Sequence, residues 1–420
     1  MVEIETVCAR EVLDSRGNPT VEAEITTCDG VFRAMAPSGA STGTHEAVEL
    51  RDGDARYLGN GVQKAVKNVK KIAEKITGEN PVRQRELDQV MLDLDGTQNK
   101  ANLGANSMLA VSMAAARAGA AAKGMQLYEY LAELAGTRGI TLPIPQMNVI
   151  NGGKHAGIEN DPQEHMFMPV GAKSISEALV MSTEAYCVLK NMLRKKFGAL
   201  ATLVGDEGGF VPPIRDVRER LDIMTSAIEE AGYKDRIKIA LDPASSEFYS
   251  KGKYTIADTT YLSGDLIDFY TELTKTYPII SIEDGMAEDD WDGWEELTKK
   301  LGHKVQITGD DLTVTNVKRI SEAVEKGAAN SLLLKVNQIG TVTEAIDAAK
   351  LAIKSGWAVT VSHRSGETED TFIADLAVGL DAGQIKAGAP ARSERLAKYN
   401  QLLRIEEGLG KKSRFFRFQK

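Results

Sequence analysis

Residues 331–340 read SLLLKVNQIG, a stretch that places a lysine directly after a long apolar run. Leu332, Leu333 and Leu334 are continuous, which is typical of a parallel strand buried on both faces. Lys335 therefore lies at or near a buried position. Burying an ammonium group is costly unless a partner compensates its charge or its pKa falls. The stretch thus predicts a buried strand that ends in a lysine whose charge is compensated by a partner or whose pKa falls.

The same pattern recurs on both sides of this stretch. From about residue 142, short apolar runs alternate with helix-like segments; the runs are VGDEGGF, IKIALDPA, IISIEDG, VQITGDDL, SLLLKVNQ, AVTVSHRS and QIKAG. Repeated β-then-α units in this number favour a closed barrel over an open sheet. Chemistry in such a barrel lies where strands end and loops begin. The polar residues that close these runs are Asp242, Glu283, Asp310, Lys335, His363 and Lys386.

Glu164 does not follow this rule, because it precedes its apolar run, HMFMPV, instead of closing it. If that strand ran antiparallel to the others, its beginning would lie beside the other strand ends. Two successive strand-like segments, IPQMNVI and HMFMPV, have no helical pattern between them, which favours this arrangement. We therefore expect one antiparallel strand, with Glu164 at the same end of the barrel as the other polar residues.

The first part of the chain predicts a smaller α+β domain. Alternating β-rich segments at 3–13, 20–27 and 31–35 are separated by turn residues, as in a three-stranded meander. Helical patterns follow at 60–76, 82–92, 105–122 and 126–134. The stretch AGTRGITLPIP supplies glycine, arginine and two prolines, which are typical of a linker. We expect domains at 1–138 and 139–420.

Composition excludes several classes of protein. The chain of 420 residues has 51 Lys plus Arg against 60 Asp plus Glu, a net charge of −9, which disfavours nucleic-acid and anionic-membrane surfaces. Cys8, Cys28 and Cys187 are far apart and lack CxxC spacing, so they indicate neither a disulfide framework nor a zinc site. The apolar segment 103–122 is interrupted by polar residues, which favours a packed helix over a membrane span. With no export signal at the N-terminus, we expect a cytoplasmic protein.

Asp242, Glu283 and Asp310 end three consecutive predicted strands, in IALD, SIED and TGDD. Hard oxygen ligands that converge from separate strands suit Mg²⁺. Alternatively, each carboxylate caps the following helix or pairs with a lysine. The pattern of three favours metal binding but leaves these alternatives open.

Two strand-end lysines, Lys335 and Lys386, are the second unusual feature. Held near a metal ion and near each other, one could lose its proton and serve as a base while the other stays charged. Each could instead be an exposed charge or a buried partner of a carboxylate. In SHRSGE, Arg364 and Ser365 fit phosphate or carboxylate binding, although a lone arginine is usually part of a surface ion pair. Glu207 in GDEGGF has small neighbours that would let a substrate approach.

Two further segments have alternative interpretations. The segment 36–47, APSGASTGTHEA, is either an ordinary loop or a mobile lid from the small domain. The tail at 411–420, KKSRFFRFQK, either carries a secondary binding role or packs its aromatic side chains on the domain with its charges in solvent.

Six long motifs together resemble the enolase family of phosphopyruvate hydratases over essentially the whole chain. They are SGASTG, NGGKHAG, GDEGGF, LLLKVNQIGT, SHRSGET and GAPARSERLAKYNQ, in that order. The resemblance implies an α/β protein: a modified (β/α)8 barrel with an antiparallel second strand, preceded by a smaller α+β N-terminal domain that bears a lid. It also implies a Mg²⁺-dependent lyase that reversibly dehydrates 2-phosphoglycerate to phosphoenolpyruvate in glycolysis and gluconeogenesis.

The resemblance also implies residue roles. Lys335 would abstract the α-proton to give a metal-stabilised enolate, and Glu207, with Glu164 beside it, would assist loss of the 3-hydroxyl. The implied substrate-binding residues are His155, Gln163, His363, Arg364, Ser365 and Lys386. The implied metal ligands are Asp242, Glu283, Asp310 and, from the lid, Ser41. Burial near cations would lower the pKa of Lys335.

The resemblance further implies a homodimer, or an octamer built of dimers, acting on a small molecule. Gly285, Ala387 and the run HMFMP depart from the commonest family pattern without removing a functional group. A dehydratase for another acid sugar or hydroxy acid is a second hypothesis, and a binding protein that has lost activity is a third. Surface display or secretion, as in the family, cannot be read from the sequence.

Overall fold

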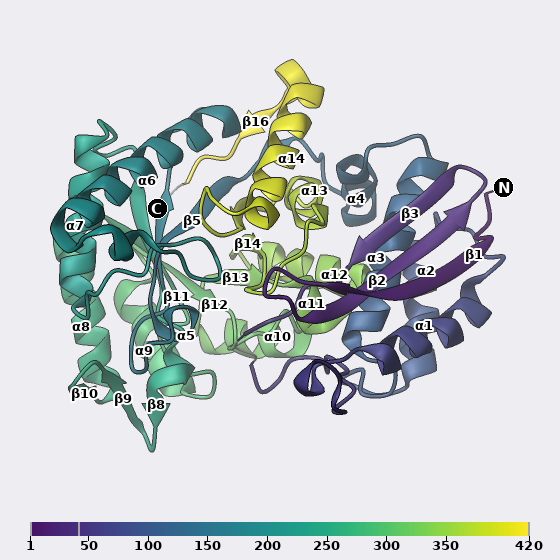
Figure 1. The fold of residues 1–420 in the computed structure, drawn as a ribbon, viewed down its shortest axis with the longest axis horizontal. Coiled ribbons are helices and arrows are strands. Elements are labelled where there is room, and N and C mark those ends of the chain that lie inside the picture. The colour runs from purple at the N-terminus through teal and green to yellow at the C-terminus, as the bar shows by residue number, and fades with distance from the viewer. Residues whose placement is uncertain (1, 41–42, 419–420) are drawn as a thin grey trace.

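The small N-terminal domain begins with an antiparallel meander (Figure 1). The computed structural model describes residues 2–40 and 43–418. The meander strands are β1 (Thr6–Leu13), β2 (Pro19–Thr27) and β3 (Gly30–Met35), with β2 in the middle. They are followed by η1 (Arg56–Gly59), α1 (Gln63–Ile76), α2 (Gln84–Asp95), α3 (Ala105–Ala122) and α4 (Leu127–Ala135). The predicted meander and four helices are confirmed.

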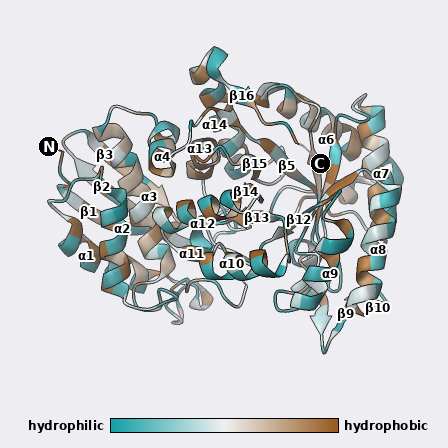
Figure 2. Cartoon of the chain, turned by 180° about the vertical axis from the view of Figure 1, so that it is seen from behind, coloured by the Kyte–Doolittle hydropathy of each residue, from teal (hydrophilic) through white to brown (hydrophobic). Residues whose placement is uncertain are grey.

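Helix α3 fills the space between the meander and the rest of the molecule. It packs against β2 and β3, and nearly all of its residues are buried. Figure 2 shows α3 in pale and brown tones, whereas the outer helix α10 (Val317–Lys326) is largely teal. Among the described residues, no helix has the length and apolar character needed to cross a membrane. The segment 103–122 is therefore a packed helix, as predicted.

In the described part of the chain, eight strands close into a barrel (Figure 1). Their apolar runs are buried, as expected for strands covered on both faces. In spatial order the strands are β11 (Ile279–Glu283), β12 (Gln306–Gly309), β13 (Ser331–Leu334), β14 (Ala358–Ser362), β15 (Gly383–Lys386), β5 (Ile144–Asn151), β6 (Glu164–Met168) and β7 (Lys238–Asp242).

Strand β6 is antiparallel to both of its neighbours, β5 and β7. Its first residue, Glu164, pairs with Asn151 at the end of β5 and with Asp242 at the end of β7. The predicted reversal of this strand is therefore confirmed, and Glu164 shares an end of the barrel with the other polar strand-end residues. We call this end the polar rim, defined by Glu164, Asp242, Glu283, Asp310, Lys335, His363 and Lys386.

The segment VGDEGGF was predicted to be a strand, and that prediction is wrong. It lies in the connection between α6 (Ile175–Phe197), with the short η2 (Ala199–Thr202), and α7 (Val217–Glu230), and Val204 and Phe210 form only isolated bridges. Gly208 has φ +86°, and a Cβ at Gly209 would lie 2.2 Å from Asn151 Oδ1. These glycines let the loop pass closely over the end of β5, which is incompatible with a regular strand.

The outer helices follow the barrel strands in sequence. They are α8 (Ser263–Thr276), α9 (Trp291–Leu301), α10, α12 (Val342–Lys354), α13 (Phe372–Gly379) and α14 (Ser393–Leu409). Several helices begin at a polar side chain that accepts a hydrogen bond from the first turn, which satisfies an otherwise unpaired backbone donor. These capping residues are Ser174, Asp216, Asp290, Asn316 and Thr341.

The remaining helices and strands are short. They are β4 (Thr141–Leu142), α5 (Gly153–Ala156), η3 (Ser245–Phe248), β8 (Tyr249–Ser250), β9 (Lys253–Ile256), β10 (Thr259–Tyr261), α11 (Val336–Ile339), η4 (Gly410–Lys412) and β16 (Arg414–Phe415). Strands β8, β9 and β10 form a separate small sheet.

The C-terminal segment packs on the end of the barrel opposite the polar rim. Strand β16 pairs with β4, and the rings of Phe415, Phe416 and Phe418 pack on a small apolar cluster of barrel residues. That cluster is Ile144, Met166, Met168 and Ala240. The packing interpretation of the tail is therefore confirmed for its described residues.

Candidate active site

The polar rim gathers side chains from almost every barrel strand. Asp242, Glu283 and Lys386 are the last residues of their strands, and Asp310, Lys335 and His363 directly follow theirs. A small cavity at this rim is lined by His155, Gln163, Glu164, Glu207, Asp242, Lys335, Ser362, His363, Arg364, Ser365 and Lys386. The structure thus brings together nearly all of the residues that the sequence singles out.

Lys386 lies among three carboxylates at the centre of this rim. Its Nζ is 2.8 Å from Asp242 Oδ2, 2.7 Å from Glu283 Oε1 and 3.2 Å from Glu164 Oε1. Burial lowers the pKa of Lys386, but these carboxylates outweigh burial and hold it well above its usual value. Lys386 is therefore a fixed positive charge.

Lys335 is paired with Asp310 through its Nζ. Burial lowers the pKa of Lys335, and the Arg364 guanidinium lowers it further, but the carboxylates around it, Asp310 first and then Glu283, raise it. The pKa of Lys335 is therefore raised in this structure, and the expectation that burial near cations would lower it is wrong here. The reason is the direct contact with a carboxylate, which favours the charged form.

The pairing of the strand-end carboxylates bears on the two alternatives to metal binding, helix capping and lysine pairing. Asp242 and Glu283 contact Lys386, and Asp310 contacts Lys335. None of them caps α8, α9 or α10, whose first turns are preceded by Leu262, Asp290 and Asn316. The helix-capping alternative is therefore wrong, and each carboxylate is a buried partner of a lysine.

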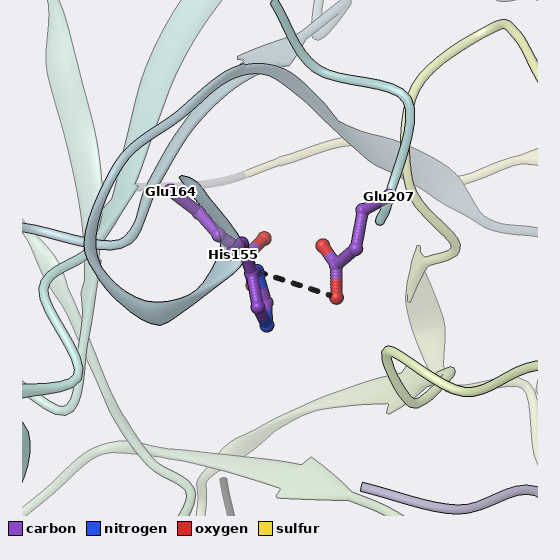
Figure 3. A group of neighbouring side chains, drawn as sticks. All are labelled: His155, Glu164 and Glu207. Carbon is purple, nitrogen blue, oxygen red and sulfur yellow. Dashed lines mark ion pairs between the residues drawn. The ribbon is translucent and has the colours of Figure 1, made fainter. Parts of the chain in front are cut away.

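His155, Glu164 and Glu207 form a compact cluster (Figure 3), and Glu164 lies beside Lys386. His155 Nδ1 lies 3.7 Å from an oxygen of each glutamate. Burial raises the pKa of Glu164 well above its usual range, and the nearby Glu207 carboxylate raises it further. Burial acts on Glu207 in the same direction, but His363 and His155 outweigh it and hold its pKa well below its usual range. The two carboxyls therefore titrate as one coupled pair, in which the pKa of Glu164 is raised and that of Glu207 is lowered.

His363 joins this cluster from the next strand end. Its Nε2 lies 3.5 Å from Glu207 Oε1, and its Nδ1 lies 2.6 Å from Arg395 Nη1. Burial lowers the pKa of His363 to about 4. Because Nδ1 faces a guanidinium, which can only donate, Nδ1 accepts the hydrogen bond and the ring proton lies on Nε2, toward Glu207.

Arg364 and Ser365 continue the rim toward the N-terminal domain. The Arg364 guanidinium contacts the Glu46 carboxylate, with Nη1 2.8 Å from Oε2. Ser365 Oγ accepts a hydrogen bond from Arg16 Nη1 at 3.4 Å. The N-terminal domain therefore contributes side chains to the edge of the cavity.

Acidic oxygens at the rim fit a cation. Among the described residues, the carboxylates of Asp284, Asp310 and Asp311 have oxygens within 4.8 Å of one another. Burial raises the pKa of Glu283, and its Oε2 is buried without a hydrogen-bond partner in the described structure. Lys386 faces oxygens of Asp242, Glu283 and Glu164 beside this cluster. A set of hard oxygen ligands suits a hard divalent cation.

Two predicted site residues remain, Gln163 and Ser41. Gln163 is buried, and its backbone N–H donates to the Asp242 carbonyl at 3.1 Å. Ser41 lies outside the described residues. The sequence interpretation missed Glu46, Gln338 and Arg395. Arg395 lies inside the quoted motif GAPARSERLAKYNQ, and the available signal was its helical spacing from Tyr399 and Leu402, which places it on the buried face of α14.

Comparison with known proteins agrees with this geometry. A model of the enolase N-terminal domain matches residues 4–131, and one of the enolase C-terminal TIM barrel domain matches residues 139–419. Curated enolases from Thermococcus kodakarensis and Pyrococcus furiosus are 60% and 58% identical to this chain over 412 residues, 97% of it and 95% of each relative. The enolase of Methanocaldococcus jannaschii is 56% identical over 410 residues, 97% of this chain and 96% of that protein. The chain belongs to the enolase family.

Proposed function

We propose that this protein is a phosphopyruvate hydratase that dehydrates 2-phosphoglycerate to phosphoenolpyruvate with Mg²⁺ and catalyses the reverse hydration. Family membership and curated relatives at 56–60% identity support the activity. The observation that carries the mechanism is one small cavity lined by two lysines, Lys335 and Lys386, and by the coupled glutamate pair, Glu164 and Glu207.

The difficult step is removal of the proton next to a carboxylate, because it places a second negative charge on that group. Stabilising this charge requires fixed cations aimed at the carboxylate oxygens. Lys386 is suited to this role, since its ammonium is buried and its pKa is held well above the usual value. Enolase-superfamily sites are an established case in which a Lys or His base acts with one or two Mg²⁺ ions.

Lys335 is the proposed base that takes the α-proton. It must first be neutral, and Asp310 opposes this in the present structure. A carboxylate that also binds a metal ion stabilises a neighbouring ammonium group less. The Arg364 guanidinium already disfavours the charged form of Lys335. Asp310 therefore links the metal site to the readiness of the base.

The glutamate pair supplies the proton for the leaving hydroxyl. The C3–O bond breaks, the electron pair of the Cα carbanion forms the new double bond, and the hydroxyl departs as water with one added proton. We assign that proton to the coupled pair and its delivery to Glu207, which is close to Glu164 and to His155 and His363. In the reverse direction the same pair removes a proton from water.

The rest of the cavity orients the substrate. Lys386 would pair with the substrate carboxylate, and Arg364 with Ser365 would hold the phosphate, since a guanidinium suits tetrahedral oxyanions. His155, His363 and Gln163 line the space between these charges.

Asp242, Glu283 and Asp310 are the proposed metal ligands from the barrel, and Ser41 is the proposed ligand from the segment outside the described residues. A bound Mg²⁺ would add positive charge beside the substrate carboxylate and stabilise the charge that develops there. The buried, unpartnered Glu283 Oε2 supports this assignment.

The test is ultraviolet detection of phosphoenolpyruvate formed from 2-phosphoglycerate, first with Mg²⁺ and then with excess chelator. We expect turnover with the metal and its loss with the chelator. Turnover that persists after complete chelation would overturn the metal assignment. No turnover with Mg²⁺ in folded protein would instead favour another hydroxy-acid substrate or a binding protein without activity.

A further inference from the structure

Glu46 of the N-terminal domain reaches the barrel, and most of its side chain is covered there. It lies near the end of the segment 36–47, of which residues 36–40 and 43–47 are described. Its side chain is only 9% exposed and contacts an Arg364 side chain that is 3% exposed. A buried carboxylate needs its partners, so its place against Arg364 is a specific feature of the fold.

The contact between Glu46 and Arg364 is bidentate. Oε2 accepts from Nη1 at 2.8 Å, and Oε1 accepts from Nη2 at 3.1 Å. Two parallel hydrogen bonds fix both the position and the plane of a guanidinium. Asn337 Oδ1 accepts a third bond from Nη1 at 3.2 Å, and Arg395 holds the backbone carbonyl of Arg364 at 2.6 Å. Arg364 is thus held from two sides, and only Glu46 supplies a compensating charge among these contacts.

Glu46 also has partners beyond Arg364. Its Oε1 accepts from the backbone N–H of Gly43 at 3.0 Å and from Gln338 Nε2 at 3.4 Å. Gln338 Nε2 in turn donates to Asp310 Oδ1 at 2.8 Å. One carboxylate therefore joins the end of the segment 36–47, the rim arginine and, through Gln338, the rim aspartate that pairs with Lys335.

We propose that Glu46 is a positioning residue, contributed by the N-terminal domain, that fixes the Arg364 guanidinium for the substrate phosphate. This inference rests on the proposed function, in which Arg364 binds the phosphate. Without the carboxylate, Arg364 would keep its charge but lose the two bonds that set its plane. Binding of the phosphate end should therefore suffer more than the chemical step.

Glu46→Gln is the variant that tests this proposal. The amide removes the charge and turns an N–H₂ group toward the guanidinium, so one bond is lost and a repulsive contact is created. We expect KM for 2-phosphoglycerate to rise roughly tenfold or more, the usual cost of a lost charge-assisted bond, while kcat changes less than about threefold. Competitive inhibition by inorganic phosphate, measured on the holoenzyme with Mg²⁺, should weaken by a similar factor.

The matched control is Glu49→Gln, since Glu49 belongs to the same domain and pairs with Arg51 without contacting Arg364. It should leave KM and phosphate inhibition within about twofold of the wild type. In an Arg364→Lys background, Glu46→Gln should raise KM little further, because the bidentate Glu46–Arg364 contact is already lost. If Glu46→Gln does not fold, Glu46→Asp is used, which keeps the charge but shortens the side chain by one methylene. A raised KM for this variant would support the proposal, and an unchanged KM would contradict it.

Three outcomes would overturn the inference. An unchanged KM in folded Glu46→Gln would show that Arg364 does not need this partner, and an equal effect in the Arg364→Lys background would show independent action. A lower KM would mean that Glu46 competes with the phosphate instead of positioning its arginine. Failure of the wild type to turn over 2-phosphoglycerate would count against the proposed function, whereas inhibition or binding by inorganic phosphate would still test the contact.

Discussion

Lys335 and Lys386 are both buried at strand ends, yet their surroundings differ. Lys386 faces Asp242, Glu283 and Glu164, while Lys335 has one carboxylate, Asp310, and is disfavoured in its charged form by Arg364. A cation with one anionic partner loses its proton more easily than a cation with three. The structure therefore separates the lysine that can exchange a proton from the lysine that stays charged.

Replacing Lys335 with alanine should lower kcat by about 10³-fold, because general-base catalysis contributes roughly 10²- to 10⁴-fold. The rate of phosphoenolpyruvate formation, measured at saturating 2-phosphoglycerate and Mg²⁺, checks this. Lys100→Ala is the control, since Lys100 is a buried lysine paired with Glu344 away from the cavity. A Lys335→Ala variant with wild-type kcat would rule out the base assignment.

Single residues were the best predicted part of the site. Strand-end position alone predicted that Asp242, Glu283, Asp310 and Lys386 converge, because the carboxyl ends of parallel strands meet at one rim. The pKa of Lys335 could not be predicted, since it depends on one contact with Asp310 that no sequence spacing encodes. Roles in the reaction stay predictions.

At the scale of elements, α13 carries a buried acid between two neighbouring helices. Asp375 accepts from Gln401 Nε2 of α14 at 3.1 Å and is only 4% exposed. Burial raises the pKa of Asp375 from 3.8 to about 6, although Arg117 opposes this. Below pH about 4 the carboxyl is protonated in the folded and unfolded states alike. Between about 4 and 6 only the folded state holds the proton, so stability falls as pH rises, and above about 6 the loss is complete.

Asp375→Asn should remove this penalty. Relative to the wild type it should gain roughly 1–3 kcal/mol of unfolding free energy at pH 8 and little near pH 4.5. Denaturant unfolding at the two pH values checks the prediction. Asp347→Asn, which breaks the exposed Arg85–Asp347 pair, is the control and should not gain stability at pH 8. A gain of equal size for Asp375→Asn at both pH values would exclude titration as the cause.

Strand β15 and the C-terminal segment make a second element-scale prediction. Gly383 has φ +83°, and a Cβ there would lie 2.5 Å from Phe416 Cδ2. Gly383→Ala should therefore displace the ring and destabilise the protein by about 1–3 kcal/mol, in addition to backbone strain.

Gly356→Ala separates these two contributions. Gly356 has a similar φ of +79°, but a Cβ there would meet nothing within 4 Å. Its cost in denaturant unfolding should therefore be the backbone strain alone and smaller than that of Gly383→Ala. Equal losses of unfolding free energy in the two variants would mean that the Phe416 ring moves aside without a cost in stability.

Strand β6 and the loop VGDEGGF show where sequence patterns predict the local structure and where they do not. The position of Glu164 before its apolar run predicted the reversal of β6. VGDEGGF has a similar apolar appearance but forms a loop, because close contact with Asn151 and the glycine conformations are tertiary features. Arg395 was missed because its partners, His363 and Asp206, lie on distant segments.

At the scale of the whole molecule, the two domains share one apolar core. A single cluster of buried side chains extends from Val21 in the meander through Leu109 of α3 to Ile239 of the barrel. Ser112 of α3 and Asp88 of α2 also accept hydrogen bonds from the first residues of α12. Neither domain can expose this interface without losing buried apolar surface.

We therefore predict one cooperative thermal transition. Calorimetry should give a single peak, with no separate melting of the N-terminal domain, at two protein concentrations so that subunit dissociation is recognised. Two resolved peaks at both concentrations would show that the domains unfold independently. The homodimer or octamer that the family resemblance implies stays a prediction, which native mass would check.

The reversal of β6 has one more consequence, for recombining this protein with other barrels. Because β6 runs away from the polar rim, α6 returns to it, and the turn between α6 and α7 delivers Glu207. In a barrel with uniformly parallel strands, the helix after this strand would end away from the polar rim, so the loop that follows it would not carry Glu207 to the rim. Inverting β6 alone would move Glu164 from the first to the last position of this five-residue strand, about 13 Å away, at the opposite end. A functional chimera must therefore inherit residues 144–242 as one indivisible block.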